Sequence, residues 1–258
     1  MPEVTATPRM EAPAESSTAP TPPPAPPLDR FQQIIFQALM LALWIGRRLP
    51  DQPLYRSAFA IGSGLYLLLP ERRRLVRSNL RRVVDWLVAN DMASTRVRRA
   101  AVDERSLDRL VRDCFGHWVV TYLEAAIGPR YSGEELKRRF VPVYPEVSAE
   151  ALSVPEPGRP GPIHMAMHFG SVDLSALYGA RVGPLPLTGP MEFVGSPLAR
   201  AYFDRVRNEL DVTIVPLGDA ATALTDALER GEAVGIVADR NIVGRGTSVE
   251  LFGRPVRL

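Results

Sequence analysis

The pattern of apolar and polar positions changes near the middle of the chain. Before residue 155 the apolar positions follow helical spacing, as in residues 107–123. After residue 162, short apolar runs alternate with amphipathic segments. The runs predict strands at 163–167, 184–188, 212–215 and 233–238, and the segments predict helices at 171–178, 197–210 and 220–229. This alternation predicts an α/β fold with a mostly parallel sheet flanked by helices.

Proline and glycine mark the boundary between the two patterns. Residues 155–162 are rich in both and read as a connector. We therefore expect a helical region at 29–155, followed by an α/β domain at 156–258. Within the helical region, Ser132 precedes two glutamates and predicts a helix start.

Residues 1–28 differ from both regions in composition. They consist largely of Pro, Ala, Thr, Ser and Glu, and end in a proline-rich run. Such a segment buries too little apolar surface to offset the entropy of ordering, so we expect a disordered tail. It lacks a basic segment followed directly by an apolar core, so it does not read as a signal peptide.

Two short apolar runs beside arginine clusters indicate contact with a membrane surface. Residues 31–45 are almost wholly apolar, but are shorter than the roughly 20 residues that span a bilayer. A second run covers 58–69, and arginines follow both runs, at 47, 48, 72, 73, 74, 77, 81 and 82. We expect interfacial helices on an anionic bilayer. The alternatives are two core helices with a solvated basic face, or one spanning segment.

Composition narrows the classes of function. Hydrophobic residues make up 46% of the 258 positions and charged residues 23%, which is a globular balance. A net charge of +2 gives no reason to expect a nucleic-acid partner. The single cysteine, Cys114, excludes an intramolecular disulfide.

His168 and Asp173 are the candidate catalytic residues. His168 follows the first predicted strand, and Asp173 lies five positions later, in a His-x4-Asp spacing. A histidine can take a proton from a hydroxyl near neutral pH, and a carboxylate can hold the ring in one tautomer. Because no Ser or Cys nucleophile lies in a recognisable elbow, we expect direct attack by an activated hydroxyl on an acyl group.

Other polar residues are predicted near the same edge of the sheet. Gly170 would let the backbone approach a substrate, and Asp239 and Arg240 end the fourth predicted strand. Ligands of open α/β sheets bind at the carboxyl ends of the strands. His164 lies four residues before His168, but on a strand the two stand roughly 13 Å apart, so we expect no metal site.

Three further segments carry a family resemblance. They are residues 77–80 (RSNL), 235–241 (GIVADRN) and 249–254 (VELFGR), which accompany the His-x4-Asp motif in this order. Together they resemble the bacterial lipid A lauroyl/myristoyl acyltransferases, within the wider His-x4-Asp glycerolipid acyltransferases. The segments at 235–241 and 249–254 look most like the phosphatidylinositol mannoside acyltransferases. Leu251 departs mildly from the family pattern, which has phenylalanine there.

The resemblance implies roles for additional residues. Glu192 matches an acidic position of the family, Arg207 matches its functional arginine, and Glu250 matches the acidic position before Phe-Gly. With Gly170, Asp239 and Arg240, these are the expected substrate-binding residues. The resemblance also implies that the family continues for several tens of residues past Phe-Gly, so we expect the α/β domain to be truncated at its C-terminus.

The implied function is an O-acyltransferase at the cytoplasmic face of the inner membrane. The donor would be acyl-CoA or an acyl carrier protein, with no metal or redox cofactor. The acceptor would be a hydroxyl of a membrane glycolipid such as a phosphatidylinositol mannoside. Alternatives are a lipid A precursor bearing Kdo, another glycolipid or a lysophospholipid. From other classes, we keep a hydrolase of acyl thioesters or phosphoesters and a non-catalytic membrane-associated module.

Overall fold

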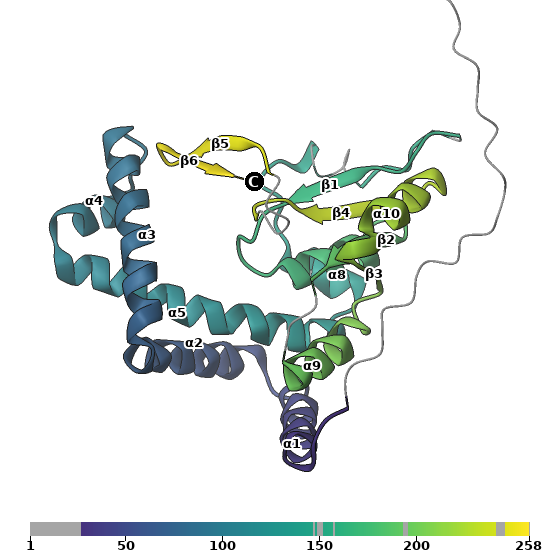
Figure 1. Cartoon of the computed structure of the whole chain (residues 1–258), viewed down its shortest axis with the longest axis horizontal. Coiled ribbons are helices and arrows are strands. Elements are labelled where there is room, and N and C mark those ends of the chain that lie inside the picture. The colour runs from purple at the N-terminus through teal and green to yellow at the C-terminus, as the bar shows by residue number, and fades with distance from the viewer. Residues whose placement is uncertain are drawn as a thin grey trace, which may run out of the picture.

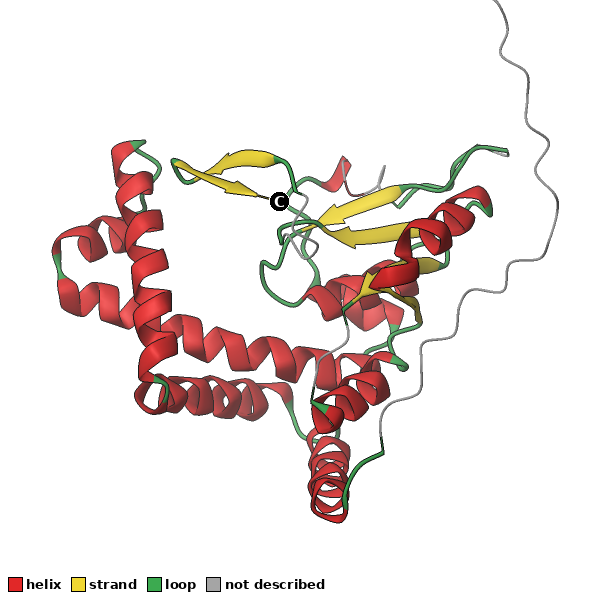
Figure 2. Cartoon of the chain, viewed as in Figure 1, coloured by secondary structure: helices red, strands yellow, loops and turns green. Residues whose placement is uncertain are grey.

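The computed structural model describes residues 27–146, 148, 152–156, 158–192, 196–240 and 246–257. The predicted tail at 1–28 therefore lies outside the described residues, except for Pro27 and Leu28. Helices alone make up one half of the molecule, and the sheet with its flanking helices makes up the other (Figures 1 and 2). The prediction of an α/β fold with a parallel sheet flanked by helices is confirmed.

The helical half follows the predicted apolar periodicity. Its elements are α1 (Arg30–Gly46), α2 (Asp51–Leu68), α3 (Pro70–Ala89), α4 (Thr95–Val102), α5 (Glu104–Ile127), η1 (Gly128–Arg130) and α6 (Gly133–Arg139). Ser132 caps α6 together with Glu135, as its sequence predicts. Asp29 and Gln32 form the same capping box at α1. Reciprocal bonds at both caps satisfy backbone donors that the first helical turn leaves free.

Helices α2 and α5 pack against each other at two glycines. A Cβ atom built on Gly62 would lie 2.7 Å from the carbonyl carbon of Phe115 and 2.8 Å from the Cα of Gly116. Gly116 in turn lies against the Phe59 ring. The two backbones therefore approach more closely than any larger residue would allow at these positions.

The sheet contains four parallel strands in the order β1-β4-β2-β3. Its elements are β1 (Ile163–Ala166), α8 (Val172–Val182), β2 (Leu187–Met191), α9 (Pro197–Arg207), β3 (Val212–Pro216), η2 (Leu217–Asp219), α10 (Ala220–Glu229) and β4 (Ala233–Val237). The chain moves from β1 over to β2 and β3, then returns to insert β4 beside β1. Because parallel crossovers are right-handed, this reversal places α10 on the opposite face from α8 and α9.

Three predicted elements have bounds that differ by three residues or more from those in the structure. Helix α8 continues to Val182, instead of ending at residue 178. The second strand runs over Leu187–Met191, instead of 184–188, because its parallel ladder with β3 begins where Leu187 faces Val212. Helix α9 ends at Arg207, instead of Leu210, because the chain turns into Asp211, whose φ of 58° is left-handed. None of these shifts moves a predicted site residue away from the carboxyl edge of the sheet.

A hairpin lies beyond the sheet. Strands β5 (Ser248–Leu251) and β6 (Arg254–Arg257) pair antiparallel, and both turn residues, Phe252 and Gly253, have positive φ. The Phe252 ring packs edge-on against Trp86 of α3, with centroids 5.4 Å apart. This contact joins the far end of the described chain to the helical half.

One hydrophobic cluster joins the two halves. Ile127, Tyr131 and Leu136 come from the helical half, whereas Leu177 lies on α8 and Leu210 follows α9. All five side chains are almost fully buried. The helical half therefore forms one continuous structure with the sheet that carries the candidate site.

No helix within the described part of the chain combines the length and the apolar character needed to cross a bilayer.

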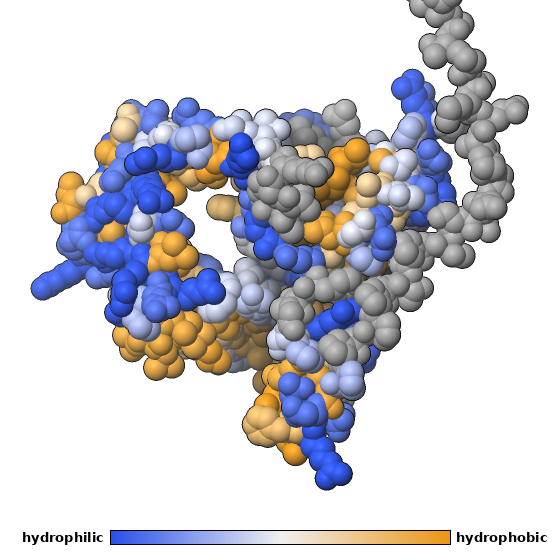
Figure 3. All heavy atoms as spheres, viewed as in Figure 1, coloured by the Kyte–Doolittle hydropathy of each residue, from blue (hydrophilic) through white to orange (hydrophobic). Residues whose placement is uncertain are grey.

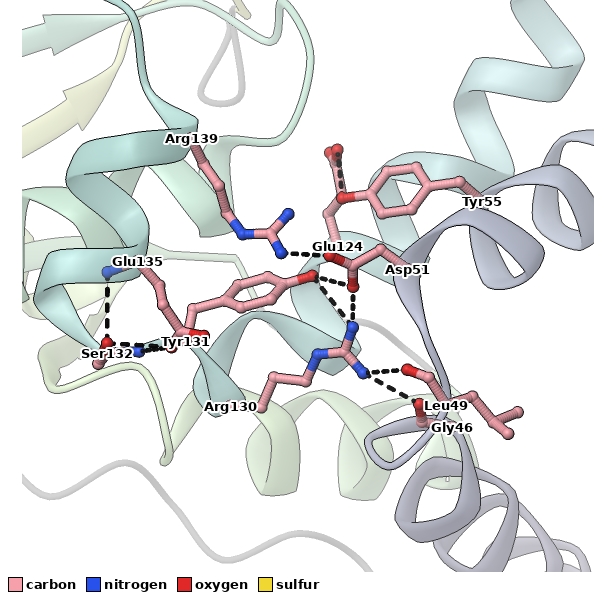
Figure 4. A network of polar contacts seen from close by, with 10 residues as sticks. All are labelled: Gly46, Leu49, Asp51, Tyr55, Glu124, Arg130, Tyr131, Ser132, Glu135 and Arg139. Carbon is pink, nitrogen blue, oxygen red and sulfur yellow. Dashed lines mark hydrogen bonds and ion pairs between the residues drawn. The ribbon is translucent and has the colours of Figure 1, made fainter.

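A polar network lies beside the hydrophobic cluster that joins the two halves of the molecule (Figure 4). Asp51, at the start of α2, accepts hydrogen bonds from Arg130, Tyr131 and Arg139. Arg130 also donates to the carbonyl oxygens of Gly46 and Leu49, at distances of 3.2 and 2.9 Å. One carboxylate thus links the α1–α2 corner to η1 and α6.

We expect Asp51→Ala to lower the free energy of unfolding by about 2 kcal/mol, because two guanidinium groups and a phenol lose a partly buried acceptor. The Asp51 side chain is only 24% exposed, so water replaces it poorly. The control is Asp113→Ala, which breaks an ion pair with the exposed Arg96 and should cost at most about 1 kcal/mol. Urea unfolding checks both variants, and equal losses would contradict the linking role of Asp51.

Candidate active site

His168 lies two residues past the end of β1, where its ring and its backbone both contact Asp239. The ring Nδ1 is 2.6 Å from Asp239 Oδ1, and the backbone N–H donates to Oδ2 over 2.8 Å. The histidine side chain is 45% exposed, whereas the aspartate is 18% exposed. A partly sheltered carboxylate therefore supports an imidazole that solvent and substrate can reach.

The pairing of β1 with β4 explains this contact. Ala166 lies opposite Val237 in the parallel register, and the Ala238 N–H donates to the Ala166 carbonyl oxygen over 3.0 Å. Two residues beyond the last pair, the same register brings His168 beside Asp239. The backbone ladder thus sets the position of both side chains.

The surroundings of the Asp239 carboxyl group lower its pKa. Burial alone would raise its pKa, but hydrogen bonds from the His168 ring and backbone, with the charge of His168, together hold the pKa below the usual range. The carboxylate therefore stays ionised near neutral pH, as a hydrogen-bond acceptor must.

Asp173 is held by a different partner. It lies in the first turn of α8, and Arg207 Nε donates to its Oδ1 over 3.0 Å. Among the described residues, the polar contacts of His168 run to Asp239 and none runs to Asp173. The structure thus differs from the His168–Asp173 contact that we expected. Gly170, with a φ of 81°, turns the chain between the two residues, and Asp173 meets α9 instead.

Arg207 joins Asp173 to the end of the second strand. Its Nη1 contacts the Met191 sulfur, and its guanidinium lies over the Phe203 ring at 4.9 Å from the centroid. Three contacts therefore fix a cation beside the carboxyl edge of β2.

A second ion pair lies at the same edge. Glu192 follows β2 and Arg240 follows β4, and their charged atoms are 3.8 Å apart. Because β2 and β4 are neighbours, the pair stands beside His168 and Asp239 along one sheet edge. Both side chains are about half exposed and are available to a polar ligand.

Glu250, another predicted site residue, lies on the hairpin and not on the four-stranded sheet. It lies in β5, opposite Pro255, on the hairpin that contacts α3. Within the described residues, no polar contact joins it to the other predicted site residues.

Metal ligands do not gather at this site. Across the ranges that the structure describes, no three His, Cys, Asp or Glu side chains are placed to hold a metal ion together.

Sequence reasoning missed the contact between His168 and Asp239. It had assigned Asp239 to substrate binding, and it lacked the strand order that makes β1 and β4 neighbours. The available signal was positional, because each residue follows the end of a predicted strand. The order of strands was needed to bring them together.

The family of the protein follows from comparison. Residues 107–258 match the family model for bacterial lipid A biosynthesis acyltransferases. The chain belongs to this family. The match begins in α5 and contains every residue of the candidate site, so this lipid acyltransferase carries His168 and Asp239 within its family-defining region. Among curated proteins, none matches the chain.

Proposed function

We propose that this acyltransferase moves a fatty acyl chain from a thioester to a hydroxyl of a membrane glycolipid. The observation that carries the proposal is the accessible His168 ring, held by a carboxylate at the ligand-binding edge of the sheet within the family match. Acyl-CoA or an acyl carrier protein is the donor.

His168 is the general base in the proposed reaction. Its Nε2 takes the proton of the acceptor hydroxyl as the oxygen attacks the thioester carbonyl carbon. The tetrahedral intermediate collapses, the carbon–sulfur bond breaks, and the departing sulfur takes the proton from the imidazolium. The histidine returns to its neutral form, and an ester and a free thiol leave. These steps need no metal or redox cofactor.

The remaining edge residues bind substrate in this proposal. Glu192 and Arg240 can hydrogen-bond sugar hydroxyls, and Arg207 supplies positive charge near a developing oxyanion. Gly170 leaves room for the reacting groups, since nothing lies within 4 Å of a Cβ built on it. Glu250 would contact the acceptor from the hairpin.

The acceptor we favour is a phosphatidylinositol mannoside. The support is the resemblance of residues 235–241 and 249–254 to the acyltransferases of those lipids. A Kdo-bearing lipid A precursor is the second candidate. Lipid profiling of a deletion strain tests the choice, because the acylated species that disappears names the acceptor. Unchanged glycolipid acylation would contradict both candidates.

The protein would act at the cytoplasmic face of the inner membrane. Helix α1 is rich in apolar residues but has no buried residue. For example, Phe31 is 70% exposed and Trp44 is 55% exposed. Figure 3 shows apolar side chains gathered along α2 and α1. Exposed apolar helices of this kind bind well at a lipid surface.

Arginines on α3 would add attraction to anionic lipid. Arg77 and Arg81 already pair with Glu104, and Arg77 also pairs with Asp108. Among the described residues, Arg72 and Arg74 form no ion pair, and both are exposed. These two cations lie in the first turns of α3, directly after the apolar α2.

We expect Arg72→Gln with Arg74→Gln to weaken binding to vesicles of phosphatidylcholine and phosphatidylglycerol roughly tenfold or more at low salt. Each arginine contributes about 1 kcal/mol near an anionic surface. The control, Lys137→Gln with Arg138→Gln, removes the same charge from α6 and should bind like the parent. Cosedimentation measures both. Equal binding by the two variants, or binding independent of salt, would contradict the electrostatic contribution.

A further inference from the structure

We propose that Arg47 is a positioning residue, which ties Arg207 at the candidate site to helix α1 at the lipid surface. The inference rests on the proposed function, in which α1 lies on a bilayer and Arg207 supplies positive charge near the developing oxyanion. Binding of α1 to lipid then also steadies Arg207.

Arg47 joins the ends of three helices. It is the C-terminal cap residue of α1. Its Nε donates to the carbonyl oxygen of Ala126, near the end of α5, over 2.9 Å, and its Nη1 lies 2.5 Å from a carboxylate oxygen of Glu209, just past α9. The side chains of Arg47 and Glu209 are only 21% and 22% exposed. Water reaches this ion pair poorly, so salt screens it less than it screens a surface pair.

Helix α1 depends on such contacts because it buries none of its residues. A helix in a protein owes most of its stability to packing, and α1 packs little against the rest of the chain. Arg130 holds the corner after α1 through the carbonyl oxygens of Gly46 and Leu49, but these contacts stay within the helical half. Arg47, in contrast, reaches the sheet half.

The turn after α9 joins Glu209 to Arg207. The Glu209 N–H donates to the carbonyl oxygen of Val206 over 3.3 Å, and the Leu210 N–H donates to that of Arg207 over 2.9 Å. Val206 and Leu210 are almost fully buried, so the turn and the end of α9 move as one piece. The Arg207 guanidinium extends from this piece to Asp173, with a hydrogen bond of 3.0 Å.

These contacts couple the lipid-facing helix to the site. When α1 moves, it pulls Arg47 away from Glu209, and the end of α9 then opens more often. Binding of α1 to lipid limits this motion, because the apolar residues of the helix then have a fixed partner. Two events that restrict the same segment favour each other in free energy. Lipid at α1 thus favours the arrangement of Arg207 that transfer needs.

Hydrogen exchange measured by mass spectrometry tests the link without any need for activity. Vesicles of phosphatidylcholine and phosphatidylglycerol are added to the full chain, and exchange of backbone amides is followed in α1 and in residues 204–210. In the parent we expect the vesicles to slow exchange about threefold or more in both segments. Glu209→Gln is nearly isosteric and leaves α1 unchanged. In this variant the vesicles should still protect α1 but should no longer protect residues 204–210.

Transfer rates on vesicles that also contain the glycolipid acceptor test the role. We expect Arg47→Gln and Glu209→Gln each to lower kcat about tenfold, with KM for acyl-CoA changed less than about threefold, because Arg207 acts in the transition state. Arg47→Lys keeps a cation and should recover part of the loss. The control is Arg205→Gln, which removes the second cation beside Glu209, 3.1 Å away and 58% exposed. Arg205 belongs to α9 itself, so this variant should exchange and transfer like the parent.

The outcomes separate this inference from the proposed function. Lipid protection of residues 204–210 that is missing in the parent, or that persists in Glu209→Gln, overturns the inference whatever the activity. Protection that is lost while the rate stays within about threefold of the parent also overturns it, since the link would not serve transfer. If the parent transfers no acyl chain, the proposed function fails, while the exchange experiment still decides the link.

Discussion

Replacing His168 with alanine should abolish acyl transfer while leaving the fold intact. Loss of a general base costs on the order of 10² to 10⁴ in rate, and this ring is the accessible proton acceptor at the sheet edge. Stability should change little because the side chain is about half exposed and its main partner, Asp239, keeps the backbone hydrogen bond. Initial rates with saturating thioester and acceptor, and the urea midpoint, are the measurements.

The matched control is His117→Ala. His117 lies on α5 and packs edge-on against Phe59, away from the sheet edge. It should retain the parent rate, which shows that the loss at 168 does not come from removing an imidazole as such. Near-parental turnover by His168→Ala would contradict the general-base mechanism.

Replacing Gly62 with alanine should destabilise the protein by about 1–3 kcal/mol, in spite of the better helix propensity of alanine. The new methyl group would meet the backbone of Phe115 and Gly116, which cannot rotate aside as a side chain can. Helices α2 and α5 would have to separate, and the apolar contacts between them would loosen. Urea unfolding of the two proteins measures the difference.

Gly64 supplies the control on the same helix. Nothing lies within 4 Å of a Cβ built there, so Gly64→Ala should gain up to about 1 kcal/mol from helix propensity alone. The two variants therefore have opposite expected signs. Equal stabilisation by both would show that α2 and α5 do not pack as closely as described.

Periodicity and turn chemistry predicted most of the fold. The alternation after residue 162 predicted the parallel sheet, and Ser132 predicted the start of α6. These features depend on residues close together in the chain. The carboxyl edge followed from them, so His168, Asp239 and Arg240 could be placed near one another before the structure was known.

The contacts within the site needed more than local pattern. Pairing His168 with Asp239 depends on β4 inserting beside β1, which the spacing of apolar residues does not encode. The hydrogen bond from Arg207 to Asp173 depends on where the end of α9 lies relative to the first turn of α8. Likewise, Asp51 meets Arg130 and Arg139 across about 80 residues or more of sequence. Long-range packing decides all three, so a one-dimensional spacing favoured the nearer carboxylate.

The most direct test of the central claim is the stoichiometry of transfer. Purified protein is mixed with labelled acyl-CoA and vesicles that contain a phosphatidylinositol mannoside, and mass spectrometry quantifies acylated lipid, free fatty acid and free thiol. We predict one acylated lipid for each thiol released, strict dependence on the acceptor lipid, and loss of both products with His168→Ala. Thiol and free acid released at the same rate without acceptor would contradict the account, because that result describes a hydrolase.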